Sequence, residues 1–420
     1  MPQPPYRLSA PLAAGDFAAV RRRAIFECCK WDPQVEDVAA LSPCVLSLDA
    51  IAWRRIAAWS ETLAEETLRA ERELHSRPRL HKLLGLPRAV RRALAAASQS
   101  GPPAEAARVM RFDFHFTTEG WRISEVNSDV PGGFIEASGV TRLMAGHCLG
   151  QSPTGDPAEA YAKAALGAVG PGGLVALVHA TAYTDDRQVM IFLARRLEQL
   201  GLRTCLIGPD QLRWQAGRAH IATAWQSGPA DVLLRFFPAE WLPNLPRRSG
   251  WPHFFAGART PLSNPATALL TQSKRFPLSW DQLEEPLPTW RALLPETRDP
   301  RAAPWRGGDW MLKPALGRAG DGIGAAGCSE AKEWRKIARD ARWHPRDWAA
   351  QRRFEIVPVE SAAGPLYPCL GVYTIDGAAA GIYGRLAARP IVDHRAQDVA
   401  VLLESAPPVV NFAEAAAYAL

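Results

Sequence analysis

The stretch VMRFDFHFTTEGWRISEVNSDVP, residues 109–131, holds side chains that suit the binding of a divalent cation and a phosphate. In its first half polar residues alternate with apolar ones, which predicts a half-buried strand with Arg111 and Asp113 on one face. The second half is predicted to form another strand, and one face of this strand carries Ile123, Glu125 and Asn127. Carboxylate and amide oxygens are ligands that Mg²⁺ prefers, and water and phosphate complete its octahedron. The stretch therefore predicts a magnesium site beside an arginine, with an ordinary solvated hairpin face as the alternative.

The elements that must position these side chains are two antiparallel strands joined by a short turn. Gly120 suits the positive φ that closes a three-residue loop, so Thr117 is expected to face Trp121. Counting from this pair sets Asp113 opposite Glu125, and the same register sets Arg111 opposite Asn127. Two opposed carboxylates destabilise a sheet unless a cation lies between them. The register therefore strengthens the prediction of a cation site.

A second group of candidate residues follows a predicted strand over residues 310–315. The loop after this strand is rich in glycine and contains Gly317, Arg318, Gly320, Gly322 and Gly324. Glycine lets backbone N–H groups approach an anion closely, and Lys313 on the strand could reach the phosphates of a nucleotide. The loop lacks the GK[ST] of a P-loop. A glycine-rich surface turn is the alternative.

Lysine is rare in this chain, with seven among 49 basic residues. Where arginine dominates, a lysine can mark a place that needs a compact point charge. This reasoning points to Lys313 and to Lys274, near the end of a predicted helix over residues 264–276. Gln351 could meet an adenine edge or lie exposed, and Arg385 could clamp a phosphate or remain a surface charge.

Composition bounds the class of protein. A chain of 420 residues with 47% hydrophobic content is long enough for two or three domains or one composite fold. No apolar run is long enough to span a bilayer, and the N-terminus lacks the pattern of a secretory signal. Seven cysteines without CxxC spacing argue against a disulfide framework and a zinc site, which favours the cytoplasm. A net charge of +6 without a basic stripe argues against nucleic-acid binding.

The predicted elements change character along the chain. Residues 15–100 are predicted to be mostly helical, with the charged face of a helix over residues 51–77 exposed to solvent. Residues 158–240 alternate strands with helices, which favours a parallel, doubly wound sheet, and no GxGxxG supports a dinucleotide role. The remainder from residue 310 is α+β, with Asp376-Gly377 joining two strands as a hairpin. Its expected elements are strands over 310–315, 347–359, 367–375 and 378–386 and a helix over 329–342.

These segments together resemble the glutathionylspermidine synthase family, whose synthetase domain is a circularly permuted ATP-grasp fold. The matching segments are RFDF (111–114), EVNSDVP (125–131), RFFPAEW (235–241), SK (273–274) and KPALGRAGDGI (313–323), and more loosely WDPQVED (31–37) and AERELHSRPRLHKLLGLP (70–87). The resemblance implies an α/β and α+β fold of ATP-grasp type. It divides the chain into a mostly helical N-terminal part (1–105), a metal and ATP hairpin (106–150), a Rossmann-like pre-ATP-grasp subdomain (151–260), and a lid with the C-terminal core (261–420).

Carried over residue by residue, the resemblance implies Mg²⁺ ligands at Asp113, Glu125 and Asn127, and places Arg111 near the transferred phosphoryl group. It further implies contacts with ATP from Lys274, Lys313, Gly317, Arg318, Gly320, Gly322, Gln351 and Arg385. The implied activity joins a small-molecule or peptide carboxylate to an amine through an acyl phosphate, with ATP and Mg²⁺ as cofactors and release of ADP and phosphate. A cytoplasmic protein without nucleic-acid or membrane partners is expected.

The chain departs from the family in two ways. It is too short for the additional N-terminal amidase domain of the bifunctional members, and Val130 stands where those members have a small hydroxyl residue in a region that contacts glutathione. The acid and the amine therefore stay open. A Mg·ATP-binding protein without ligase activity and a small-molecule kinase are the alternatives. His115 is interpreted as a structural histidine, because no general base stands out.

Overall fold

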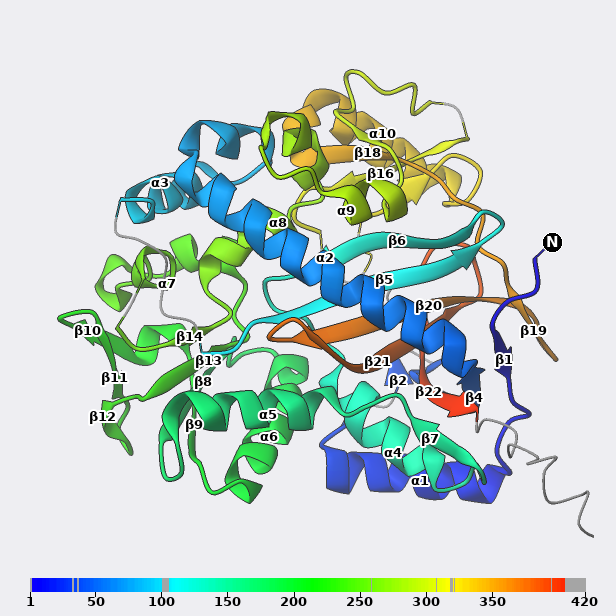
Figure 1. Cartoon of the computed structure of the whole chain (residues 1–420), viewed down its shortest axis with the longest axis horizontal. Coiled ribbons are helices and arrows are strands. Elements are labelled where there is room, and N and C mark those ends of the chain that lie inside the picture. Colours follow the sequence, from blue (N-terminus) through cyan, green and yellow to red (C-terminus); the bar gives the residue numbers. More distant parts are fainter. Residues whose placement is uncertain are drawn as a thin grey trace, which may run out of the picture.

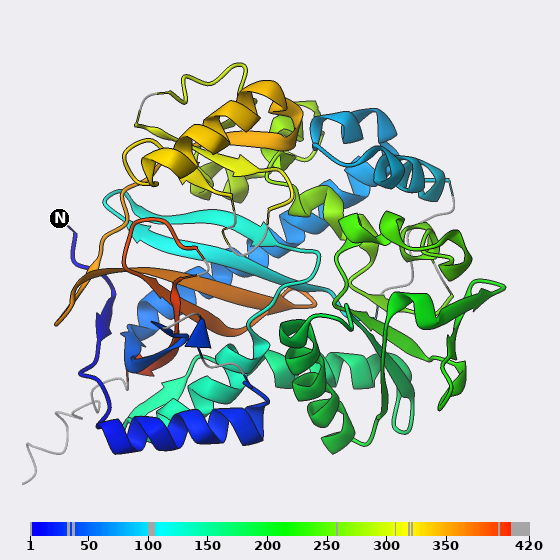
Figure 2. The ribbon, with the colours of Figure 1, turned by 180° about the vertical axis from the view of Figure 1, so that it is seen from behind.

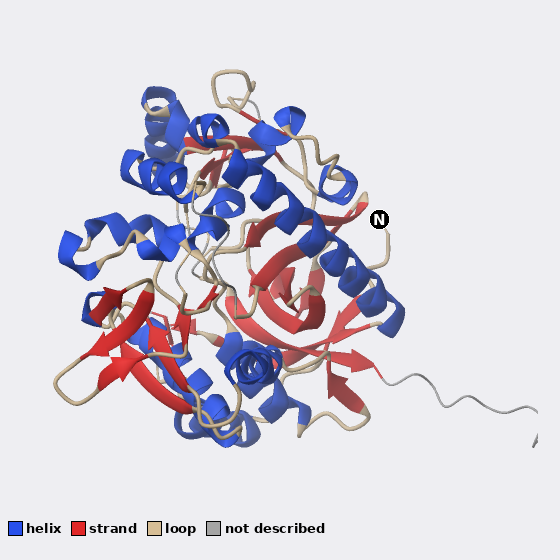
Figure 3. Ribbon diagram, turned by 60° about the vertical axis from the view of Figure 1, so that its left-hand side comes forward, coloured by secondary structure: helices blue, strands red, loops and turns tan. Residues whose placement is uncertain are grey.

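The computed structural model describes residues 2–31, 34–35, 38–99, 106–257, 259–306, 308–317, 320, 322–393 and 395–404. Its largest sheet among these residues, called here the large sheet, has nine strands, with the main path β1–β4–β22–β21–β20–β5–β6 and with β19 beside β20 and β7 beside β22. The sheet curls in the middle of the molecule (Figures 1 and 3). Its strands are β1 (Tyr6–Leu8), β4 (Leu41–Leu48), β5 (Val109–Thr117), β6 (Gly120–Asn127), β7 (Gln151–Pro153), β19 (Val359–Ser361), β20 (Gly364–Ile375), β21 (Ala378–Ala387) and β22 (Gln397–Glu404).

Helix α2 (Ala50–Ser76) lies diagonally across one face of the large sheet, as the long blue helix in front of β5, β20 and β21 shows (Figure 1). Its N-terminus is capped by Asp49, whose side chain accepts hydrogen bonds from two backbone N–H groups. Phe112 and Phe114 belong to the same buried apolar cluster as Ile56 of this helix. Because side chains alternate along a strand, Arg111 and Asp113 must then point to the opposite face of the sheet, which is seen from behind in Figure 2.

The predicted parallel sheet is present in the order β14–β13–β8–β9, with all neighbours parallel. The strand β8, LVALV, is apolar throughout and completely buried, as expected for a strand with both faces covered. Helices α5 (Pro157–Val169) and α6 (Thr184–Gln199) share an apolar cluster with this sheet. The strands are β8 (Leu174–Val178), β9 (Arg203–Ile207), β13 (Val232–Arg235) and β14 (Leu262–Ser263), and an antiparallel sheet that was not predicted consists of β10 (Leu212–Gln215), β11 (Arg218–Ala222) and β12 (Ser227–Pro229).

A third sheet carries Lys313 and is called here the Lys313 sheet. Its order is β15 (Thr297–Arg298), β18 (Trp348–Arg352), β16 (Trp310–Pro314) and β17 (Gly324–Ala325), and helix α10 (Ala331–Trp343) packs on it. The single strand predicted over residues 347–359 is wrong. Its first part is β18 in this sheet, and its last residue begins β19 in the large sheet. Pro358, just before β19, has no N–H with which to continue a ladder.

The N-terminal third contains the predicted helices α1 (Ala14–Cys28), α2 and α3 (Arg88–Ala97), but it also supplies β1 and β4 to the large sheet. The strand β4, LSPCVLSL, was missed because serine and proline interrupt its alternation. It forms between β1 and β22, and the latter lies more than 340 residues further along the chain. No helix in the described ranges combines the length and the apolar character that crossing a bilayer requires.

The expectation that the charged face of α2 is exposed to solvent is wrong for two of its glutamates. Glu66 is buried and accepts hydrogen bonds from the backbone N–H groups of Thr289 and Trp290, at 3.0 and 3.1 Å. Glu71 is buried against Arg108. Their partners lie far away in the sequence, so α2 ties distant segments together through its carboxylates instead of exposing them.

Candidate functional site

The predicted hairpin is present, and its register places four candidate side chains together on the face of the large sheet that α2 leaves open. β5 and β6 pair antiparallel, with Asp113 opposite Glu125 and Arg111 opposite Asn127. Both pairs are those expected from the sequence. The alternation that buries the phenylalanines of β5 under α2 is therefore what directs these polar groups to one place.

The turn of the hairpin differs from the prediction. Thr117 pairs with Gly120, whose φ is +91°, so the loop is one residue shorter than expected. A register shift beside Phe114 makes Ser124 an extra residue in β6 and restores the predicted pairs beyond it. The bulge also turns Ile123 to the opposite face, where it pairs with Phe114 in the core, so its predicted place beside Glu125 is wrong. The signal was present, because the apolar residues of β6 fall at 121, 123 and 126, with one interval too long for a regular strand.

Asp113 lies at the centre of the site and is buried. Arg111 donates to both of its carboxylate oxygens, from Nε to Oδ1 at 2.8 Å and from Nη2 to Oδ2 at 3.1 Å. Oδ2 also accepts from Asn127 Nδ2 at 3.3 Å and from Arg385 Nη2 at 3.4 Å. Burial by itself would raise the pKa of Asp113, but the charge and hydrogen bonds of Arg111, assisted by Arg385, hold that pKa below its usual 3.8. The carboxylate is therefore ionised at neutral pH.

Glu125 is balanced by the two lysines that the sequence singled out. Lys274 Nζ lies 3.2 Å from Glu125 Oε2 and donates to the carbonyl of Gly317 at 2.7 Å. Lys313 Nζ donates to the carbonyl of Ser124, the bulge residue, at 3.0 Å. Burial would raise the pKa of Glu125, but the charges of Lys274, Lys313 and Arg385 together hold that pKa below 4.5. Burial also lowers the pKa of Lys313 to about 8, against the pull of Glu125, which still leaves this lysine protonated at neutral pH.

Gln351 lies on β18 opposite Met311 of β16, so it belongs to the Lys313 sheet. It is buried, and the alternative that it is an exposed polar side chain is wrong. Its Nε2 donates to Thr297 Oγ1 at 3.1 Å, whereas its buried Oε1 accepts no hydrogen bond from the described residues. An acceptor of this kind is costly to leave unsatisfied. It lines a cavity of about 20 Å³ together with Glu125 and Lys274.

A second cavity, of about 60 Å³, lies between the large sheet and the Lys313 sheet. Its lining includes Glu125, Arg385 and His115 from the first and Lys313 from the second. Both cavities share Glu125, so the candidate residues surround it from two sides. A volume of about 60 Å³ has room for only a few water molecules and is too small for a nucleotide.

The contacts of His115 support its interpretation as a structural histidine. Its Nδ1 donates to the carbonyl of Pro368 and its Nε2 accepts from Ser124 Oγ, each at 3.1 Å. The carbonyl of Pro368 can only accept, so Nδ1 carries the proton of the neutral ring and Nε2 is left as the acceptor. Burial lowers the pKa of His115 to about 4, so the ring is uncharged at neutral pH and both of its nitrogens are occupied.

The glycine loop lies beside Lys274 and the segment around Val392. Gly320 has φ of +77°, and a Cβ there would lie 2.3 Å from the carbonyl oxygen of Val392, so another residue would clash with the backbone. Gly322 also has a positive φ, and Gly317 provides the carbonyl that Lys274 contacts. Arg318 lies outside the described residues. The roles of the loop residues in binding phosphate stay predictions.

Three residues of the site were missed from the sequence. Gly371 of β20 lies opposite Asp113, and a Cβ there would be only 2.7 Å from Arg111 Cδ. A glycine inside a strand is the signal that could have indicated this close approach. Tyr383 of β21 lies under the guanidinium groups of Arg111 and Arg385, and Tyr373 of β20 donates to the carbonyl of the loop after β6.

The donor set fits a hard divalent cation. Asp113 and Glu125 are held ionised, and the side-chain amide of Asn127 directs its Nδ2 to Asp113, which leaves its Oδ1 as a further oxygen donor. No group of three or more His, Cys, Asp or Glu in the described ranges forms a metal cluster. Two carboxylates and an amide suit Mg²⁺ that arrives with phosphate oxygens and water in its remaining positions, and do not suit a protein-only cage.

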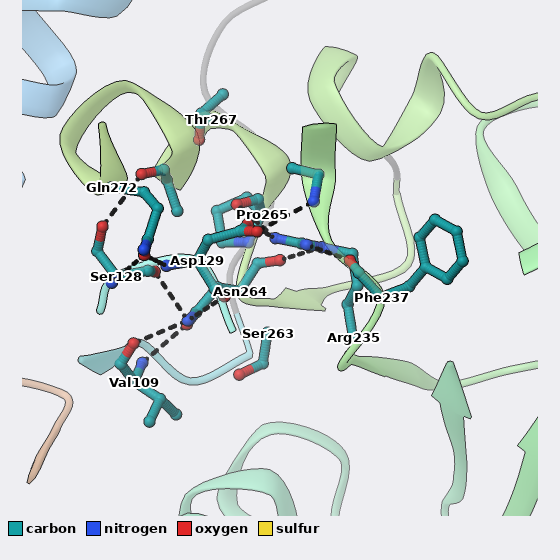
Figure 4. A network of polar contacts seen from close by, with 12 residues as sticks. Val109, Ser128, Asp129, Arg235, Phe237, Ser263, Asn264, Pro265, Thr267 and Gln272 are labelled. Atoms are coloured by element: carbon teal, nitrogen blue, oxygen red, sulfur yellow. Dashed lines mark hydrogen bonds and ion pairs between the residues drawn. The ribbon is translucent and has the colours of Figure 1, made fainter. Parts of the chain in front are cut away.

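A buried polar network fixes the loop that follows β6 (Figure 4). Asn264 accepts from the N–H of Val109 at 2.8 Å, and its Nδ2 donates to the carbonyls of Val109, Ser128 and Asp129. Asp129 forms a completely buried ion pair with Arg235, at the end of β13 in the parallel sheet. The network ties the start of β5 and the end of β6 to the parallel sheet. Ser128 and Asp129, which follow Asn127 in the EVNSD segment, therefore have a structural role in this network. The sequence alone did not indicate that role.

Comparisons with known proteins identify the family to which the chain belongs. The family model described as glutathionylspermidine synthase preATP-grasp matches residues 42–404. The fold is similar to that of a glutathione synthetase-like effector from Globodera pallida in its apo form, with a TM-score of 0.59 and 11% identity over 86% of this chain and 90% of that chain. A putative gamma-glutamylcysteine synthetase from Methylobacillus flagellatus KT is 14% identical over 81% of this chain and 87% of that chain, with a TM-score of 0.43. No curated protein matches. The match over most of its length shows that this chain belongs to the glutathionylspermidine synthase family, with an ATP-grasp fold of the glutathione synthetase-like class.

Proposed function

We propose that this chain is an ATP-dependent carboxylate–amine ligase that forms an amide through an acyl phosphate. One observation carries the proposal. Two ionised carboxylates and an amide lie beside four cationic side chains, between the large sheet and the Lys313 sheet, although they come from well-separated parts of the chain. The residues are Asp113, Glu125, Asn127, Arg111, Lys274, Lys313 and Arg385.

The arrangement of these charges suits the binding of a nucleoside triphosphate. Lys274 and Lys313 supply positive charge on the two sides of Glu125, where they would neutralise the phosphates. The unsatisfied Oε1 of Gln351 would accept a hydrogen bond from the exocyclic amine of adenine. Because the cavities hold no more than a few waters, the two sheets must move apart for the nucleotide to enter.

Mg²⁺ would be held by Asp113, Glu125 and Asn127, and when bound it would neutralise charge on the phosphoryl group and its leaving oxygen. A free carboxylate resists attack by an amine because it is anionic and has a poor leaving group. Phosphorylation removes both obstacles: a substrate carboxylate oxygen bonds to the γ-phosphorus as the bond to the β-phosphate oxygen breaks, and ADP leaves.

In the second step the amine nitrogen bonds to the acyl carbon, phosphate departs with the bonding electron pair, and the amine proton passes to phosphate or solvent. Arg111 and Arg385 converge on Asp113, and they would stabilise first the phosphoryl group in transit and then the oxyanion of the tetrahedral intermediate. A single preorganised donor of this kind contributes about 10²–10³ in rate. His115 has no part in this proton transfer, since both of its ring nitrogens are engaged.

The test is release of ADP by the purified protein with Mg·ATP over a panel of acids and amines that includes amino acids, glutathione and other small peptides, and polyamines. We expect at least one pair to give ADP together with a product whose mass is that of the amide. Asp113→Asn and Lys313→Ala should abolish ADP release without loss of fold, and Lys82→Ala, at an exposed lysine, is the matched control. Full turnover by Lys313→Ala would reject the assignment.

The same experiment separates the competing functions. A small-molecule kinase would give a phosphorylated product instead of an amide. A nucleotide-binding protein without ligase activity would bind Mg·ATP and release no amine-dependent ADP. The intact set of ionised carboxylates favours the ligase, because a site that no longer catalyses has no need to keep a charged, buried Asp113 beside a charged, partly buried Glu125.

A further inference from the structure

We propose that Tyr383 is a positioning residue that holds Arg111 and Arg385 in the geometry required for phosphoryl transfer, and that Asp398 and Lys30 hold Tyr383 in turn. The inference rests on the proposed ligase function. It concerns a part of the site for which the sequence offered no motif.

Tyr383 contacts both guanidinium groups of the site. The Cζ of Arg111 lies 5.0 Å from the centroid of its ring, and that of Arg385 lies 5.6 Å from the same centroid. A tyrosine ring attracts cations to its face. Two long, flexible arginines that carry the same charge would otherwise repel each other and adopt many rotamers. The ring, together with Asp113 on the other side, keeps them together at one place.

One glycine gives Arg111 its room and another gives the Tyr383 ring its room. Gly371 is the cross-strand partner of Tyr383, and a Cβ there would collide with the Arg111 side chain. Gly133 has φ of +97°, and a Cβ there would lie 2.8 Å from the ring of Tyr383. The ring is thus packed directly against the backbone of the loop after β6. Arg111 donates to the carbonyl of Gly132 in that loop at 2.5 Å, so ring and guanidinium share one support.

The hydroxyl end of Tyr383 is anchored by charged groups that the proposed chemistry does not use. Its OH donates to Asp398 Oδ1 at 2.6 Å. The other oxygen of Asp398 lies 3.4 Å from Lys30 Nζ, and Lys30 also pairs with Glu136. Burial raises the pKa of Tyr383 well above its usual 10.0, so the phenol remains protonated and remains a donor. Lys30, which follows helix α1, therefore connects the N-terminal part of the chain to the arginines.

This arrangement has a consequence for function. Lys274 and Lys313 contact the Glu125 side of the site, whereas Tyr383 contacts Arg111, Arg385 and Asp398. Loss of the ring should therefore disturb the arginines and leave the lysines in place. The affinity for a nucleoside diphosphate should change little. The stabilisation that the arginines give to the phosphoryl group in transit should fall.

The test compares the affinity for Mg·ADP with that for Mg·ADP–aluminium fluoride, which imitates the transferred phosphoryl group and requires no knowledge of the acid or the amine. Tyr383→Leu should weaken binding of the fluoride complex about 10-fold or more, since two cation–π contacts are lost, and should leave binding of Mg·ADP within about twofold. Tyr383→Phe keeps the ring and the fold and loses only the anchor, so it should show the same selective effect at a smaller size.

Tyr161→Phe is the matched control, because it removes a buried tyrosine hydroxyl that bonds Ser263 Oγ at 2.8 Å, away from the arginines. Equal loss of both nucleotide complexes in Tyr383→Leu, or no change in either Tyr383 variant, would overturn the positioning role while the ligase proposal stands. Failure of the unmodified protein to bind either complex would instead reject the proposed function, and this inference with it.

Discussion

Gly371→Ala should impair the site while the strand around it remains intact. Gly371 lies within β20 and does not have a positive φ, so alanine can adopt its backbone conformation without strain. The added Cβ would lie 2.7 Å from Arg111 Cδ, 2.8 Å from Arg111 Nε and 2.9 Å from Asp113 Oδ1. All three atoms belong to the two-bond ion pair at the centre of the site. The substitution therefore acts on the arginine and the carboxylate directly.

The size of the effect follows from these distances. Ordinary contact of a Cβ begins at 3.4 Å, so the nearest atom of Arg111 must retreat by about 0.7 Å. A misplacement of about 1 Å in a catalytic geometry can cost about 10² in rate. We therefore expect kcat to fall about 100-fold. The free energy of unfolding should fall by only about 1–3 kcal/mol, which is typical of one extra buried methyl group and is partly offset by the reduced freedom of the unfolded chain.

The assay is steady-state ADP release with the best acid and amine from the substrate screen, together with urea unfolding followed by circular dichroism. Gly167→Ala in helix α5 is the matched control, because a Cβ there meets no atom within 4 Å, and it should keep full activity. A Gly371→Ala protein with unchanged kcat would refute the reasoning. It would mean that the Arg111–Asp113 geometry is not what the reaction requires.

Two further predictions concern stability. Glu66→Ala should lower the free energy of unfolding by about 3 kcal/mol, since it leaves the partly buried N–H of Thr289 and the buried N–H of Trp290 without their acceptor. Urea denaturation checks this. Glu65→Ala, at a neighbouring glutamate whose side chain is 68% exposed, should change the free energy of unfolding by less than about 0.5 kcal/mol. Asp299 is subject to burial, which would raise its pKa, but Arg301 and Arg275 hold that pKa below the usual 3.8. Its charge therefore stabilises the fold fully above pH 3.8 and progressively less as the pH falls below that value. Unfolding measured from pH 5 to pH 3 should lose less stability in Asp299→Asn than in the unmodified protein, and an identical loss in both would contradict the assignment.

Sequence patterns with a short period were enough to locate much of the site. Alternation in β5 directs Arg111 and Asp113 to one face, and the register with β6 follows from counting along a hairpin. Asp376 and Gly377 have φ of +50° and +86°, as a tight hairpin requires, and the predicted turn between β20 and β21 is confirmed. In each case the relevant interaction lies within about 20 residues of chain, so the local order of residue types determines it.

The helical and parallel-sheet regions were also predictable, because buried strands such as β8 are apolar throughout and amphipathic helices repeat with a regular period. The prediction from sequence fails where a strand pairs with a segment that is distant in the chain. β4 and β22 are parallel neighbours although more than 340 residues separate them, and neither was predicted as a strand. Their short apolar runs become strands only because each finds an edge to pair with.

Only the tertiary structure decided which groups surround the predicted carboxylates. Gly371 and Arg385 reach Asp113, and Tyr383 reaches Arg111, because β20 pairs with β5 and β21 is the next strand in the sheet, although more than 250 residues separate these strands from β5 in the chain. The glutamates of α2 are buried because hydrogen-bond donors reach them from short helical segments about 200 residues away. A carboxylate on a helix has the same local sequence whether it is solvated or buried, and only the arrival of a distant donor makes burial favourable. The amino-acid sequence by itself therefore determined which side chains could bind metal and phosphate, and the packing of remote strands determined how those side chains are charged, oriented and held.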